Sequence, residues 1–80
     1  MDIKHGLIVF LKSEILEDTS IEINGEDQLL SSGLVDSLGL MRIVRYIEKH
    51  SGITVPFEDI TLENFMSVDS IVTYVNNISN

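Results

Sequence analysis

The sequence predicts an all-α fold, a small four-helix bundle with three main helices, one short helix and a long first loop. Two observations lead to this prediction. Apolar residues recur at helical spacing in three segments of the 80-residue chain, and residues that favour turns gather between those segments. We expect residues 1–80 to form a single domain, because a chain of this length is the size of one small domain.

The first helix is predicted from a run of apolar residues that recur every four positions. They are Ile3, Leu7, Leu11 and Ile15. This spacing is typical of an amphipathic helix of about 14 residues. The pattern ends at residues 17–20, where Asp18, Thr19 and Ser20 favour turns and caps.

Residues 18–36 have no clean period and are predicted to form a long loop, a kind of segment that is uncommon in small domains and often functional. We expect its apolar residues to hold it against the core. They are Ile21, Ile23, Leu29, Leu30 and Leu34.

The second helix is predicted to begin at Ser37 and to bury one stripe, which consists of Leu40, Ile43, Val44 and Ile47. Lys49 and His50 suit its last turn, and Gly52 ends it. Pro56 prevents the helix from continuing, and residues 61–65 can form a short third helix. Ser67 is predicted to cap the last helix, whose buried stripe is Val68, Ile71, Val72 and Val75. We expect residues 76–80 to fray.

Thirteen acidic residues against five basic ones give a net charge of −8. Such a charge disfavours nucleic acids and anionic membranes as partners, and it favours enzymes with basic docking patches. The absence of cysteine excludes disulfides and thiolate metal sites. No apolar run is long enough to cross a membrane, and the first 16 residues do not resemble a signal peptide. We therefore expect a monomeric cytoplasmic protein.

The pair Asp36–Ser37 stands where the long loop meets the second helix. Both residue types are good helix caps, so a purely structural role is one interpretation. Three features favour a functional one: the long loop before the pair, Gly39 in the first turn, and an exposed face on the new helix. That face consists of Leu38, Met41, Arg42 and Arg45, and apolar residues ringed by charge are typical of a docking surface.

An enzymatic role is disfavoured, because Ser37 lacks a histidine at any recognisable spacing and lacks the hydrolase elbow sequence. Residues 20–31 have only a faint likeness to a calcium loop, with serine in place of the acids at both ends. We therefore predict no catalytic residues and no metal site. His5 and His50 are expected to be solvated.

The stretch LLSSGLVDSLGLMRIVRYIEKHSGITV, followed by ENFMSVDSIVTYV, resembles the acyl carrier proteins. The motif Asp36–Ser37–Leu38 matches the family's modification signature. The resemblance covers about residues 29–75 in its specific motifs, and the first helix agrees in length and pattern only. It identifies residues 1–80 as a single acyl-carrier-like domain.

The resemblance implies that a phosphopantetheinyl transferase attaches 4′-phosphopantetheine from coenzyme A to Ser37, with Asp36 as the motif acid near the transferase's metal. The thiol of that arm then holds an acyl group as a thioester for loading and transfer enzymes of fatty-acid, polyketide or related biosynthesis. The helix after the serine is the family's recognition surface, which assigns partner contact to Leu38, Met41, Arg42 and Arg45. Candidates to shelter an acyl chain, or to be ordinary core, are Leu40, Ile43, Ile47, Phe65 and Ile71.

One departure separates this chain from fatty-acid carriers, whose recognition helix is strongly acidic. Here Glu48 is the only acid between Ser37 and His50, and Arg42 and Arg45 are basic. The chain is more similar to specialised stand-alone carriers that serve an adenylating ligase, so aryl, D-alanyl or other aminoacyl cargo remains an alternative. A different class also remains open, namely an unmodified acidic helical module that docks through the same face.

Overall fold

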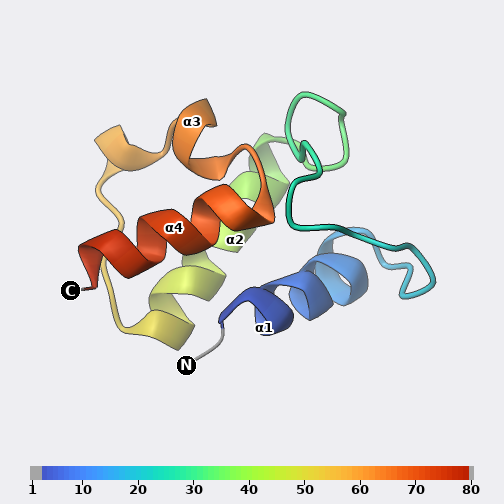
Figure 1. Ribbon diagram of the computed structural model, residues 1–80, viewed down its shortest axis with the longest axis horizontal. Helices are drawn as coiled ribbons and strands as arrows, with labels where there is room; N and C mark the ends of the chain where they lie inside the picture. The colour runs from blue at the N-terminus through green and yellow to red at the C-terminus, as the bar shows by residue number, and fades with distance from the viewer. Residues whose placement is uncertain (1–2, 80) are drawn as a thin grey trace.

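The amphipathic stripes of the sequence pack against one another in four helices. The computed structural model describes residues 3–79 (Figure 1). The helices are α1 (Ile3–Phe10), α2 (Ser37–Ser51), α3 (Leu62–Phe65) and α4 (Val68–Ile78). A π-helical turn, η1 (Leu11–Ile15), extends α1, and a 3₁₀ turn, η2 (Phe57–Asp59), precedes α3. The predicted small helical bundle is thereby confirmed.

The first helical segment has the predicted length, but its second part is a π-helix and not an α-helix. Residues spaced by four drift by about 40° per step around an ordinary α-helix, which has 3.6 residues per turn. The wider π turn of η1 reduces this drift, so Ile15 packs against the core beside buried Leu11. Glu17, at a φ of 53°, then ends the segment, and the amide of Asp18 donates to the carbonyl of Lys12 at 2.9 Å.

The predicted helix boundaries after residue 36 agree closely with the structure. α2 ends at Gly52, whose φ of 69° is left-handed and suits glycine. The hydroxyls of Thr61 and Ser67 cap α3 and α4. The prediction of a frayed tail from residue 76 is wrong for residues 76–78, because α4 continues through Ile78; Asn80 lies outside the described residues.

The helices enclose one core, into which the long first loop inserts three side chains, those of Ile23, Leu29 and Val35. The loop runs along the outside of the bundle between η1 and α2 (Figure 1). It is held by Ile23 and Leu29, which are buried, and by a hydrogen bond of 2.8 Å from the Leu29 amide to the Met66 carbonyl. The buried apolar residues are Leu7, Leu11, Ile23, Leu29, Val35, Ile43, Val44, Ile47, Val55, Phe65, Val68, Ile71, Tyr74 and Val75.

None of the helices described in residues 3–79 is long and apolar enough to cross a membrane.

Candidate functional site

The start of α2 is fixed from both sides by the long loop. Val35 is buried, and its amide donates to the carbonyl of Leu29 at 2.9 Å. The next residue, Asp36, caps the helix: its carboxylate accepts from the amide of Gly39 at 2.8 Å, and its carbonyl accepts from the amide of Leu40. Asp36 therefore performs the capping role that the sequence left open between Asp36 and Ser37.

Ser37 is the first residue of α2, and its side chain is exposed. Within residues 3–79 its hydroxyl makes no hydrogen bond, so the oxygen is available to an external reactant. The first amides of a helix favour negative charge beside them by about 0.3–1 kcal/mol. A phosphate ester on Ser37 would lie in that favourable field.

The chain's second Asp–Ser pair provides an internal comparison, because Asp69–Ser70 also lies in the first turn of a helix. There the hydroxyl of Ser70 is half-buried and accepts from Ser67 at 3.1 Å, while the carboxylate of Asp69 pairs with the Lys4 ammonium at 3.0 Å. Both functional groups of that pair are thus engaged within the fold. Of the two pairs, only Asp36–Ser37 presents an exposed hydroxyl without an internal partner.

Gly39 allows the close packing under this site, a role that the sequence did not indicate. It is buried, and a Cβ added there would lie 3.0 Å from the Val35 side chain and 3.5 Å from Ile15. The glycine that weakens the first turn of α2 therefore lets the capping loop and η1 approach the helix.

The exposed face predicted after Ser37 is present. Leu38 is 77% exposed and Met41 is 45% exposed, and their spacing of three residues places both on one face of α2. Arg45 is exposed beside them. Arg42 is exposed as well, but it is held toward the end of η1, where its guanidinium donates to the Glu14 carbonyl at 2.9 Å.

Glu48 has a structural role that sequence reasoning missed. Its carboxylate accepts from the amide of Val55 at 2.9 Å and so fastens the connection between α2 and α3. Because this is the only acid in α2, the outward face of the helix carries apolar and basic side chains and no acidic one. No sequence pattern indicates that a glutamate side chain will accept a hydrogen bond from the backbone amide seven residues later.

The predicted candidates for an acyl shelter form the ordinary core of the bundle. Ile43, Ile47, Phe65 and Ile71 are each at most 1% exposed, and Leu40 packs against the same cluster. Across residues 3–79 there is no group of three His, Asp or Glu side chains that could hold a metal ion. His50 is exposed, but its ring packs against Tyr46 at a tilt of 34°, with ring centroids 4.3 Å apart.

Comparison with known proteins decides the family. The family model described as "Phosphopantetheine attachment site" matches residues 8–75. The chain belongs to this family of carrier proteins. Its cofactor is covalently attached 4′-phosphopantetheine, and the exposed, unpartnered hydroxyl at the start of α2 fits such a group.

The chain is also similar to two curated relatives along nearly its whole length. It is 31% identical to the D-alanyl carrier protein of Streptococcus suis strain 98HAH33, over 94% of this chain and 92% of the relative. It is 28% identical to the D-alanyl carrier protein of Streptococcus mutans serotype c, over 100% of this chain and 99% of the relative. The predicted resemblance to phosphopantetheine-binding carriers is confirmed.

A solved structure shares the fold. The crystal structure of an FAD-dependent dehydrogenase contains a chain that superposes with a TM-score of 0.78 and 25% identity. The match covers 86% of this chain and 97% of that one, so the matching chain is itself about as short as this carrier.

Proposed function

We propose that this carrier holds an aminoacyl group on an arm attached to Ser37, that an adenylating ligase loads it, and that a second enzyme receives the group. The observation that carries the proposal is the similarity to D-alanyl carrier proteins over nearly the full length of both chains. The phosphopantetheine thiol supplies the site at which the cargo is held as a thioester.

Ser37 is proposed as the attachment residue because its hydroxyl is the exposed, unengaged one of the two Asp–Ser pairs. During attachment the Ser37 oxygen forms a bond to the phosphorus of coenzyme A that bears pantetheine. The bond from that phosphorus to the bridging oxygen breaks, and adenosine 3′,5′-bisphosphate leaves. The serine proton passes to a base of the transferase, so this chain supplies only the nucleophilic oxygen.

The chain's own residues prepare this oxygen in two ways. Asp36 uses its carboxylate to cap Gly39, which fixes the first turn and points the backbone amides of α2 toward the new phosphodiester. The Asp36 side chain is also exposed and next to Ser37 in sequence, so a transferase that binds Ser37 would meet this carboxylate as well. Asp36 is therefore the proposed motif acid.

A small cargo is favoured over a long fatty acyl chain. The side chains that would line an acyl shelter are packed in the core, with Ile43 and Phe65 each 1% exposed. An aminoacyl group is short and polar and needs no such shelter. The outward face of α2 also lacks the acids that fatty-acid enzymes with basic patches would pair with.

The attachment residue is tested by intact mass after incubation with coenzyme A, magnesium and a broad-specificity phosphopantetheinyl transferase. We expect the wild type to gain one phosphopantetheinyl group, Ser37→Ala to gain none, and the matched control Ser70→Ala to gain one. A mass gain in Ser37→Ala would show that the phosphopantetheinyl group is attached to another residue. An unmodified wild type would favour the interaction module instead.

The cargo is tested on the modified protein. It is incubated with ATP, D-alanine and a D-alanine-activating ligase, and in parallel with a malonyl-transferring enzyme of fatty-acid synthesis and malonyl-coenzyme A. We expect a mass gain of one aminoacyl group in the first reaction and none in the second. Loading by the fatty-acid enzyme alone would refute the aminoacyl assignment while leaving the attachment at Ser37 intact.

A further inference from the structure

A surface groove between α1, η1 and α2 is not explained by cofactor attachment. It has a volume of about 530 Å³ and is lined by Phe10, Glu14, Arg42, Arg45, Tyr46, Lys49 and His50. Three of the chain's five Lys and Arg residues lie in this one lining, together with one of its two histidines. On a chain with a net charge of −8, this groove is a concentrated basic site.

The helix geometry explains how these side chains converge. Arg42, Arg45 and Lys49 follow one another at spacings of three and four along α2, so they lie on one face. Phe10 and Glu14 are four residues apart on the facing segment. Arg45 and Lys49 are exposed and form no ion pair within residues 3–79, so both charges face solvent.

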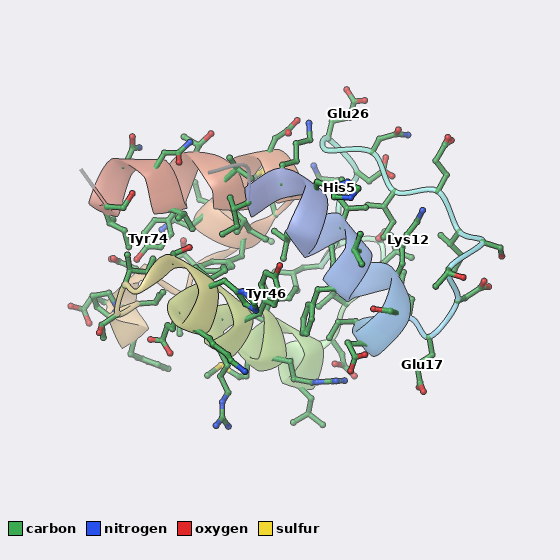
Figure 2. All side chains as sticks on the ribbon, turned by 90° about the horizontal axis from the view of Figure 1, so that it is seen from below. His5, Lys12, Glu17, Glu26, Tyr46 and Tyr74 are labelled. Carbon is green, nitrogen blue, oxygen red and sulfur yellow. The ribbon has the colours of Figure 1, made fainter. Side chains whose placement is uncertain are left out.

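The groove has an aromatic wall. Phe10 stacks on Tyr46 with ring centroids 4.6 Å apart, and Tyr46 packs on His50 at 4.3 Å. Figure 2 shows Tyr46 between α2 and α1, where a Cβ added to Gly6 would lie 2.6 Å from its hydroxyl oxygen. The wall is therefore built from closely packed side chains of both helices.

The one acid in the groove does not neutralise it. The Glu14 carboxylate is 3.9 Å from the Arg42 guanidinium, a distance at which an exposed pair contributes little. Arg42 is also occupied by the Glu14 carbonyl. Arg45 and Lys49 remain as the two cations that an incoming ligand would meet first.

We infer that this groove docks an acidic segment with an apolar side chain on the adenylating ligase that loads the carrier. Complementary charge is the argument, since three of the chain's five Lys and Arg residues line this groove while the net charge of the chain is −8. The groove also continues the exposed stripe of Leu38, Met41 and Arg45 that starts at Ser37. From Ser37 to Lys49 the stripe is about 18 Å long at the rise of an α-helix.

This inference rests on the proposed function only in naming the ligase as the partner. The whole-chain charge predicts partners with basic patches, whereas the groove predicts that the loading partner presents acids at this position. The two statements concern different parts of the surface.

The experiment uses the full unmodified chain and a defined probe, an acetylated Glu-Glu-Trp-Glu-Glu pentapeptide, with binding followed by backbone amide chemical shifts at a low salt concentration of about 10 mM. We expect shifts that cluster at Phe10, Tyr46 and His50. Arg45→Glu and Lys49→Glu should each weaken binding roughly tenfold, because like charges then face the peptide. Lys12→Glu, which makes the same charge change outside the groove, should weaken binding much less than either groove variant.

Three results would overturn the inference: no clustered shifts, an equal loss of affinity in Lys12→Glu, or tighter binding of a Lys-Lys-Trp-Lys-Lys peptide at the groove. A fourth would do so as well. If adenosine 3′,5′-bisphosphate shifts these residues and the acidic peptide does not, the groove is a small-anion site. The mass assay at Ser37 is independent of all four, so a failure here is distinguishable from a failure of the proposed function.

Discussion

Two adjacent residues, Asp36 and Ser37, have separate tasks at the start of α2. The Asp36 carboxylate accepts from the Gly39 amide at 2.8 Å, while the Ser37 hydroxyl stays exposed. We expect Asp36→Ala to lower the free energy of unfolding by about 1 kcal/mol, the usual effect of losing a helix cap. Ser37→Ala should change it by less than about 0.5 kcal/mol, because the exposed hydroxyl has no partner to lose. Urea unfolding of both variants measures this difference.

The matched control for the cap is Asp36→Asn, because asparagine caps helices as well as aspartate does. We expect this variant to keep the wild-type stability. It lacks the carboxylate, so a loss of transferase modification in Asp36→Asn would assign the acid a role in attachment. If Asp36→Asn were as unstable as Asp36→Ala, the charge beside the helix would be the stabilising factor and the hydrogen bond would not.

At the scale of an element, the end of the first helical segment is strained. Glu17 has a φ of 53°, in the left-handed region where a Cβ is unfavourable. We expect Glu17→Gly to raise the free energy of unfolding by about 0.5–1 kcal/mol, because glycine removes that clash at a smaller cost in chain entropy. Thermal unfolding measures the change.

Glu17→Ala is the control for this change, since it removes the acidic side chain and keeps the Cβ. Glu17 projects outward at the end of η1 (Figure 2), so its side chain itself contributes little. Alanine should therefore give no gain. Equal stabilisation by alanine and glycine would instead attribute the effect to relief of acidic repulsion.

The turn η2 is tied to α4 by a hydrogen bond of 2.6 Å from the Tyr74 hydroxyl to the Asp59 carboxylate. Burial, followed by this bond and by the charges of Asp59 and Glu58, raises the pKa of Tyr74 to about 12. In the unfolded chain the pKa of tyrosine is about 10. The folded pKa is higher, so this contribution to stability is fully present below about pH 10 and is lost as the pH rises to about 12.

We expect the difference in unfolding free energy between wild type and Tyr74→Phe to shrink between about pH 10 and pH 12, by about 3 kcal/mol at most. The phenylalanine variant keeps the ring and serves as its own control for burial. Phenolate absorbance of the folded wild type checks the assignment. A Tyr74 phenol that titrates near its ordinary pKa would contradict it.

The sequence predicted the elements whose signals are local. The stripe Ile43, Val44 and Ile47 and the stop at Gly52 lie within a few residues of one another, and their pattern was sufficient. The π turn η1 was missed because its hydrogen bonds are shifted by one residue, a change that an apolar period of four does not distinguish from an α-helix. The extension of α4 was missed because Asn76 and Asn77 have low helix propensity, and packing of Val75 overrides it.

In the candidate site, too, the features with a local sequence signal were predicted and those that depend on tertiary packing were not. Ser37 was located because the motif, the loop and the helix start are contiguous in sequence. The basic groove was not predicted, because its lining comes from two distant parts of the chain. Phe10 and Glu14 belong to one segment, and Arg45 and Lys49 to another more than 30 residues later. Which residues of two helices face each other depends on tertiary packing, and no local pattern contains that information.

At the scale of the whole molecule, charge is distributed unevenly, and salt should therefore have two opposite effects. The net charge of −8 makes the folded chain repel itself, and added salt screens that repulsion. The groove lined by Arg45 and Lys49 attracts acids, and salt screens that attraction as well. We expect the melting temperature to rise, and the affinity for the acidic pentapeptide to fall, between about 10 mM and 1 M sodium chloride. With added salt, the melting temperature of Lys12→Glu should rise more steeply than that of the wild type. Its affinity for the acidic pentapeptide should fall in parallel with that of the wild type. An affinity that stays constant over this range would show that the peptide binds through its tryptophan alone and that the basic groove is not the reason for docking.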